Sequence, residues 1–144
     1  MKRILIILII GFVFVTVQAQ MDNPLKKGMP NTVTLSNGEV IYDLNGEWEV
    51  SVVHYGPWQM LGELSDLMEI KQEDASFVGI TLLGNPRYPK GSERLIGELD
   101  KSGFKKVQTI TKAGLIDLNG EILNNGNRMI FDDGTKLRLT FTRK

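Results

Sequence analysis

The stretch GEWEVSVVH, residues 46–54, decides the fold. Apolar side chains recur at every second position, at Trp48, Val50 and Val52, and the polar Glu49 and Ser51 separate them. Period-two alternation is typical of a β-strand that packs one face against a core. The sequence therefore predicts a strand over residues 47–54 with these three side chains on its inner face.

Seven more strands are predicted after this one, with turn signals about every 8 to 12 residues. They cover residues 67–73, 76–83, 93–100, 104–111, 115–123, 128–132 and 135–143. Most links are tight and carry glycine or asparagine, and short links favour antiparallel neighbours. The expected fold class is all-β: an eight-stranded antiparallel up-and-down barrel, in which closure removes exposed edges. A sandwich of two sheets is the alternative.

Two links in this pattern are long, at residues 55–66 and 84–92, and they carry Trp58, Met60 and Tyr88. In a meander, successive links alternate between the two ends. These are the first and third links, so both lie at one end of the barrel. Long loops at one end of a closed barrel are where a ligand mouth is expected.

The region before the barrel divides into three parts. Residues 32–36 and 40–42 flank Asn37-Gly38, a strong hairpin signal, and the barrel domain is assigned to residues 32–144. Residues 20–31 hold two prolines, a glycine and few β-formers, which predicts a flexible N-terminal segment. Residues 1–19 have the pattern of a targeting signal.

Residues 1–19 have the layout of a secretory signal peptide: Lys2 and Arg3, an apolar run, and compact residues ending at Ala19. A membrane anchor is the alternative, but the apolar run is shorter than the roughly 20 residues of a spanning helix. We expect cleavage after Ala19, a periplasmic or secreted location, and no membrane span afterwards. The chain has no cysteine, so no lipoprotein anchor follows the signal.

Composition excludes several classes of function. The 17 basic side chains balance 17 acidic ones, so no basic excess favours nucleic acid. Without cysteine there is no disulfide, thiolate nucleophile or cysteine metal site. One histidine cannot make a histidine-rich zinc site. We therefore expect neither a cofactor nor a metal.

The first strand opens with Gly46 and Trp48 in a Gly-x-Trp pattern, and Arg143 continues the inward phase of the last strand. Together with the strand count, this resembles the lipocalin-like (calycin) barrels, and residues 68–72 and 76–79 resemble strands of small bacterial members. The resemblance implies that Gly46 lets the chain pass close beneath the barrel. It also implies that Trp48 plugs the closed end under the Arg143 guanidinium, a favourable cation–π contact.

Tentative ligand contacts are predicted at the mouth: His54, Trp58, Met60, Arg87 and Tyr88. His54 follows the inward phase of its strand and can act as a base, touch a ligand or serve the structure. The loop aromatics can equally pack onto the barrel, and Arg87 can be solvated. No nucleophile and base pair up in the sequence, so an enzyme is not expected.

The expected function is non-covalent binding of a small, partly apolar molecule at the barrel mouth. The alternative is a protein-interaction or structural module whose barrel is filled, with an exported protein as partner. An eight-stranded barrel is wide enough for either. A cavity of about 300 Å³ or more between the two long loops would favour the binder.

Overall fold

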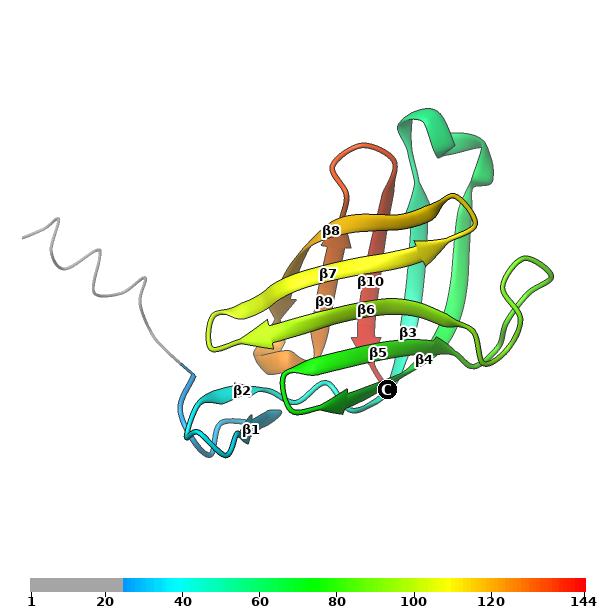
Figure 1. The fold of residues 1–144 in the computed structure, drawn as a ribbon. Helices are drawn as coiled ribbons and strands as arrows, with labels where there is room; N and C mark the ends of the chain where they lie inside the picture. Colours follow the sequence, from blue (N-terminus) through cyan, green and yellow to red (C-terminus); the bar gives the residue numbers. More distant parts are fainter. Residues whose placement is uncertain (1–24) are drawn as a thin grey trace, which may run out of the picture.

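A closed barrel with a short hairpin beside one end makes up residues 25–144, the part of the chain that the computed structural model describes (Figure 1). Residues 1–19, the predicted signal peptide, lie outside the described residues. The elements in chain order are β1 (Thr32–Thr34), β2 (Val40–Tyr42), β3 (Gly46–His54), the 3₁₀ helix η1 (Gly56–Leu61), β4 (Glu63–Glu73), β5 (Ser76–Thr81), β6 (Glu93–Asp100), β7 (Gly103–Thr111), β8 (Gly114–Leu123), the 3₁₀ helix η2 (Asn124–Gly126), β9 (Arg128–Asp132) and β10 (Leu137–Arg143).

The barrel confirms the predicted all-β, eight-stranded antiparallel meander. Strands β3 to β10 each pair with their chain neighbours, and β10 returns to pair with β3. In that closing ladder Leu137 lies opposite His54, and Arg143 lies opposite Trp48. Closure leaves no unpaired edge among these strands, so the sandwich alternative is excluded.

Strand boundaries differ from the expected ones mainly around the first long link. β4 begins at Glu63 rather than at residue 67, and Leu64 and Asp66 pair with Val52 and Val50 of β3. Asp66 is polar although it faces the barrel interior, so the alternation of apolar and polar residues does not reveal the first part of β4. The residues left between β3 and β4 form η1, which the sequence pattern did not predict.

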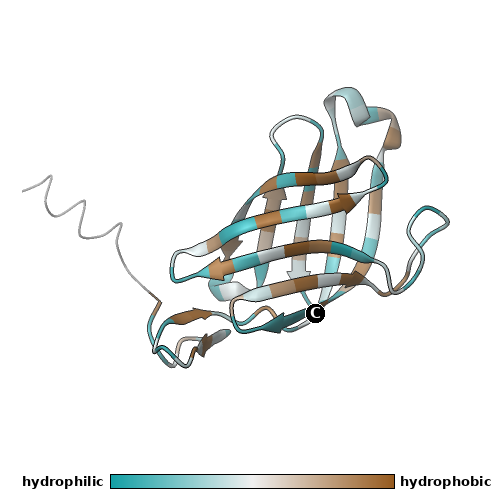
Figure 2. Ribbon diagram, viewed as in Figure 1, coloured by the Kyte–Doolittle hydropathy of each residue, from teal (hydrophilic) through white to brown (hydrophobic). Residues whose placement is uncertain are grey.

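One half of the barrel is filled by a row of aromatic rings. The ring centroids are 6.4 Å apart for Trp48 and Phe141, 5.3 Å for Phe141 and Phe131, 4.9 Å for Phe131 and Phe104, and 5.7 Å for Phe104 and Phe77. Edge-to-face and tilted contacts at these distances are the favoured aromatic geometries. Brown bands alternate with paler and teal bands along the strands in Figure 2, and the buried positions also alternate along β5 and β10.

An inward-facing glycine makes room for this row. A Cβ on Gly97 would lie 2.5 Å from both the Lys106 carbonyl oxygen and a ring carbon of Phe77. A second inward glycine, Gly120, lies under the rings of Phe104 and Phe131 in the same way. The rings can therefore approach the barrel wall only because these positions lack a side chain.

Trp48 lies at the closed end, as the sequence predicted. Its indole is fully buried, and Nε1–H donates to the Leu44 carbonyl at 2.9 Å. The Arg143 guanidinium carbon lies 4.4 Å from the Trp48 ring centroid. Arg143 also donates to the backbone carbonyls of Asp43, Asn45 and Gly126, so the last strand is joined to the chain that enters the first.

Gly46 permits this entry. Its φ of +129° lies in a region that side-chain-bearing residues rarely adopt, and its missing Cβ would sit 3.9 Å from Arg143 Nη1. The segment before it packs against the barrel, with Ile41 and Leu44 fully buried. The Gln72 side chain holds that segment, accepting from the Leu44 N–H and donating to the Tyr42 carbonyl. The predicted hairpin around Asn37-Gly38 is present as β1 and β2.

Candidate functional site

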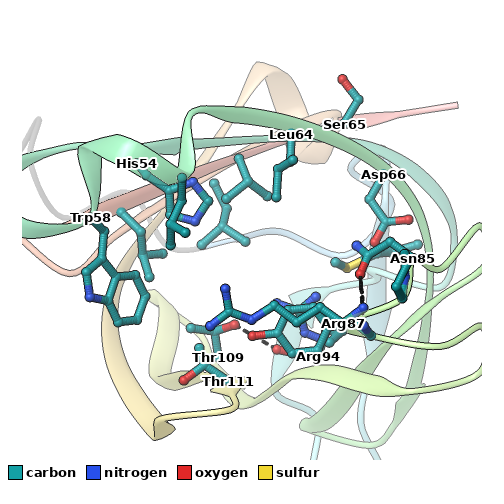
Figure 3. A pocket seen from close by; sticks show the side chains of 17 residues that line it. His54, Trp58, Leu64, Ser65, Asp66, Asn85, Arg87, Arg94, Thr109 and Thr111 are labelled. Carbon is teal, nitrogen blue, oxygen red and sulfur yellow. Dashed lines mark hydrogen bonds between the residues drawn. The ribbon is translucent and has the colours of Figure 1, made fainter.

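A cavity of about 330 Å³ opens at the end of the barrel opposite Trp48 (Figure 3). It lies where η1 and the loop between β5 and β6 come together, as the alternation of links predicts. Its lining residues are Val52, His54, Trp58, Leu61, Leu64, Ser65, Asp66, Met68, Asn85, Pro86, Arg87, Tyr88, Arg94, Thr109, Thr111, Leu137 and Leu139.

The walls of this mouth cavity are mainly apolar. Val52, Met68 and Leu139 come from the inner faces of β3, β4 and β10, continuous with the filled half of the barrel. Leu64 lies in the wall as well and keeps 48% of its surface exposed. Such a lining suits an apolar ligand surface, because apolar groups gain free energy on leaving water.

His54 and Trp58 stand together at one side of the cavity, with ring centroids 6.2 Å apart (Figure 3). The Gly62 carbonyl lies 2.7 Å from His54 Nδ1 and also accepts the His54 backbone N–H. Because a carbonyl only accepts, Nδ1 is the donor in this hydrogen bond. His54 therefore anchors the link that contains η1.

A second contact anchors the same link. The Tyr55 hydroxyl donates to Asp132 at 2.6 Å, and this hydrogen bond, together with burial, raises the pKa of Tyr55 to about 12. Lys136 Nζ lies 5.5 Å from the Trp58 ring centroid. The link that contains η1 is thus held to the β9–β10 hairpin, across the line where β10 pairs with β3.

Met60 is placed differently from the other predicted contacts. It is 90% exposed and does not line the cavity. In a 3₁₀ helix, side chains three positions apart share a face, so Trp58 and Leu61 point inward together and Met60 points away. Of the five predicted contacts, the structure brings His54, Trp58, Arg87 and Tyr88 to the cavity.

The β5–β6 loop holds Arg87 and Tyr88 in a tight turn. The Asn85 side-chain oxygen accepts the backbone N–H groups of both residues, at 2.9 and 2.8 Å. Asn85 and Tyr88 also exchange backbone hydrogen bonds across the turn. The loop is therefore ordered by its own hydrogen bonds, and it presents the half-buried Tyr88 ring to the cavity.

Arg94 also lines the cavity, although the sequence pattern did not predict it. Leu95 pairs with Gly79 while Glu93 pairs with Ile80, so Arg94 is the extra residue of a β-bulge in β6. A bulge re-aims a side chain that regular alternation would send outward. The Thr109 hydroxyl donates to the bulged Arg94 carbonyl at 2.8 Å and satisfies that group.

Asp66 is the other lining residue that carries chemistry and was not predicted. Its carboxylate accepts the Thr81 hydroxyl, at 2.8 and 2.7 Å from its two oxygens, and the Leu67 backbone N–H at 2.8 Å. Thr81 is fully buried and its hydroxyl also accepts the Gly84 N–H. Asp66 thus holds the base of the β5–β6 loop from inside the barrel.

The two guanidiniums of the mouth cavity lie on the same wall (Figure 3). Arg87 and Arg94 lie with Thr109 and Thr111, across from His54 and Leu64 (Figure 3). Burial lowers the pKa of Arg94 from its ordinary value, and the negative charge of Asp66 acts in the opposite sense. A guanidinium stays protonated at neutral pH despite such a shift.

Within residues 25–144, no group of three or more His, Cys, Asp and Glu side chains could hold a metal ion. Over the same residues, no helix has the length and apolar composition needed to cross a membrane. Comparisons with protein-family models, with curated proteins and with solved structures find no match.

Proposed function

We propose that this protein is an exported, lipocalin-like barrel that binds a small, partly apolar molecule non-covalently at its mouth. The observation that carries the proposal is the cavity of about 330 Å³ between η1 and the β5–β6 loop. It falls within the roughly 300 to 1,000 Å³ of small-molecule sites, which combine apolar walls with a few polar groups. The Trp48–Arg143 cap and Gly46 at the closed end support the lipocalin-like part of the proposal.

The alternative, a filled barrel that serves as a protein-interaction module, is less well supported. A filled interior would leave no room between the two long loops. The observation in its favour is the group of exposed apolar side chains near the mouth, among them Met60, Leu83 and Leu115. Apolar patches of this kind also mark protein contacts, so the test must separate the cavity from its rim.

Titration with the neutral, apolar dye N-phenyl-1-naphthylamine provides the test. We expect saturable fluorescence enhancement in the parent, and at least about tenfold weaker binding in a Trp58→Ala, Tyr88→Ala double variant, since two aromatic walls are lost. Met60→Ala is the matched control, because Met60 shares η1 with Trp58 but lies outside the cavity. It should bind as the parent does.

Two results would overturn the proposal. One is the absence of saturable dye binding by the folded parent protein. The other is equal affinity in the parent and in the double variant, with Met60→Ala weakened instead, which would place the apolar contact on the rim. Thermal melts of each variant establish that the loss of binding is not a loss of folding.

A further inference from the structure

Arg94 forms no ion pair with the described residues that line the mouth cavity. The ion pairs within residues 25–144 are Lys105–Glu98, Lys136–Asp133, Arg138–Asp132 and Lys144–Glu47, and Arg94 takes part in none of them. Its side chain is nevertheless half-buried. A partly desolvated cation without an ion-pair partner is costly, and an anionic ligand would offset that cost.

Two contacts hold the guanidinium of Arg94, and a third holds its backbone. Its central carbon lies 3.4 Å from the Tyr88 ring centroid, and its Nε–H donates to the Ile110 carbonyl at 3.1 Å. The Thr109 hydroxyl holds the bulge from which the side chain departs. Among the described residues, Nη1 and Nη2 of Arg94 have no hydrogen-bond acceptor, so the Nη1–Nη2 edge of the guanidinium is available to a ligand.

The balance of charge around this fork favours an anion. Arg87 brings a second guanidinium to the same wall, with its central carbon 5.8 Å from the Tyr88 centroid. Asp66 is the carboxylate among the cavity-lining residues, and its two oxygens already accept hydrogen bonds from Thr81 and Leu67. Two guanidiniums against one carboxylate leave the cavity lining with a net positive charge.

We propose that the ligand is an amphipathic carboxylate whose head binds the Nη1–Nη2 edge of Arg94 and whose apolar body lies against Leu64, Met68 and Leu139. This inference rests on the proposed function and adds the chemical class of the ligand. A planar guanidinium edge matches a carboxylate through two parallel hydrogen bonds. At about 30 Å³ for each water-sized group, a cavity of 330 Å³ holds roughly 11 non-hydrogen atoms, the size of a medium-chain acid.

Competition against N-phenyl-1-naphthylamine by decanoate, decanol and decylamine tests the head group with a common tail. The parent should prefer decanoate to decanol by about tenfold or more, the effect of hydrogen bonds to a charged group. Arg94→Gln should remove that preference and leave decanol within about twofold, the range of neutral substitutions. Arg94→Lys should keep part of it, because charge remains while the fork is lost.

Arg128→Gln is the matched control, since it removes the same charge from an exposed position at the start of β9, away from the cavity. It should keep the parent preference. Equal binding of decanoate and decanol by the parent, or a preference for decylamine, would overturn this inference while leaving the apolar binding site intact. Failure of the dye and of all three competitors to bind would instead overturn the proposed function.

Discussion

Replacing Trp48 by alanine tests whether the closed end carries the stability of the barrel. The indole is fully buried, contacts Phe141 edge-on, donates to Leu44 and lies beneath Arg143. Burying about 200 Å² of aromatic surface at about 25 cal/mol per Å² stabilises by about 5 kcal/mol. Alanine keeps little of this contact and leaves the Leu44 carbonyl without its donor.

We therefore expect Trp48→Ala to lower the free energy of unfolding by about 3 to 5 kcal/mol, the range measured for large aromatic truncations in cores. Trp48→Phe should cost less, because a ring remains and mainly the hydrogen bond is lost, worth about 1 kcal/mol. Trp58→Ala should cost less than about 2 kcal/mol, since its half-buried indole borders an open cavity.

Urea unfolding followed by circular dichroism measures these differences, with the denaturant slope compared between variants to verify a two-state transition. A Trp48→Ala protein within about 0.5 kcal/mol of the parent, the range of neutral surface changes, would refute this reasoning. Equal costs for Trp48→Ala and Trp58→Ala would refute it as well, because the two ends of the barrel would then contribute alike.

Two further outcomes are expected. Gly97→Ala should lower the free energy of unfolding by about 1 to 3 kcal/mol, because the new methyl group overlaps the Lys106 carbonyl and Phe77. A second change, Phe77→Leu, should recover part of this loss in urea melts. If the free-energy costs of the two changes simply add in the double variant, the packing contact is contradicted. Ultraviolet titration should show one of the three tyrosines ionising near pH 12 rather than near 10, a step that Tyr55→Phe removes. The stability from the Tyr55–Asp132 hydrogen bond is thus present below about pH 10 and is lost as the pH rises toward 12. An ultraviolet titration with no tyrosine ionising near pH 12 would contradict this hydrogen bond.

The barrel was predictable because its defining signals are local and repeated. Alternation places Trp48 and Arg143 inward on β3 and β10, and the register pairs them across the closing seam. Counting links is then enough to put η1 and the β5–β6 loop at the same end, since a meander with tight turns admits no other arrangement. The placement of Trp58, Arg87 and Tyr88 at the mouth follows from that count, whereas the count leaves open whether the interior is filled.

Arg94 and Met60 show where sequence patterns stop being informative. Strict alternation from the buried Leu95 sends Arg94 outward, and only the bulge opposite Gly79 and Ile80 turns it inward. Nothing in one strand's sequence reveals a bulge that depends on its partner's register. The prediction for Met60 was wrong for a related reason. Its direction depends on a short 3₁₀ helix, and a stretch of six residues does not define the phase of that helix.

The question of an open or filled interior has a physical answer in the distribution of side-chain size along the barrel. Toward the closed end, inward positions carry large rings such as Trp48, Phe131 and Phe141, which occupy the full width. Toward the mouth, the inward Val52 and Thr109 are smaller than these rings, and space remains among the lining side chains. Because barrel diameter follows from strand number, the cavity results from this change in side-chain volume, and the closed end stabilises the fold independently of any ligand.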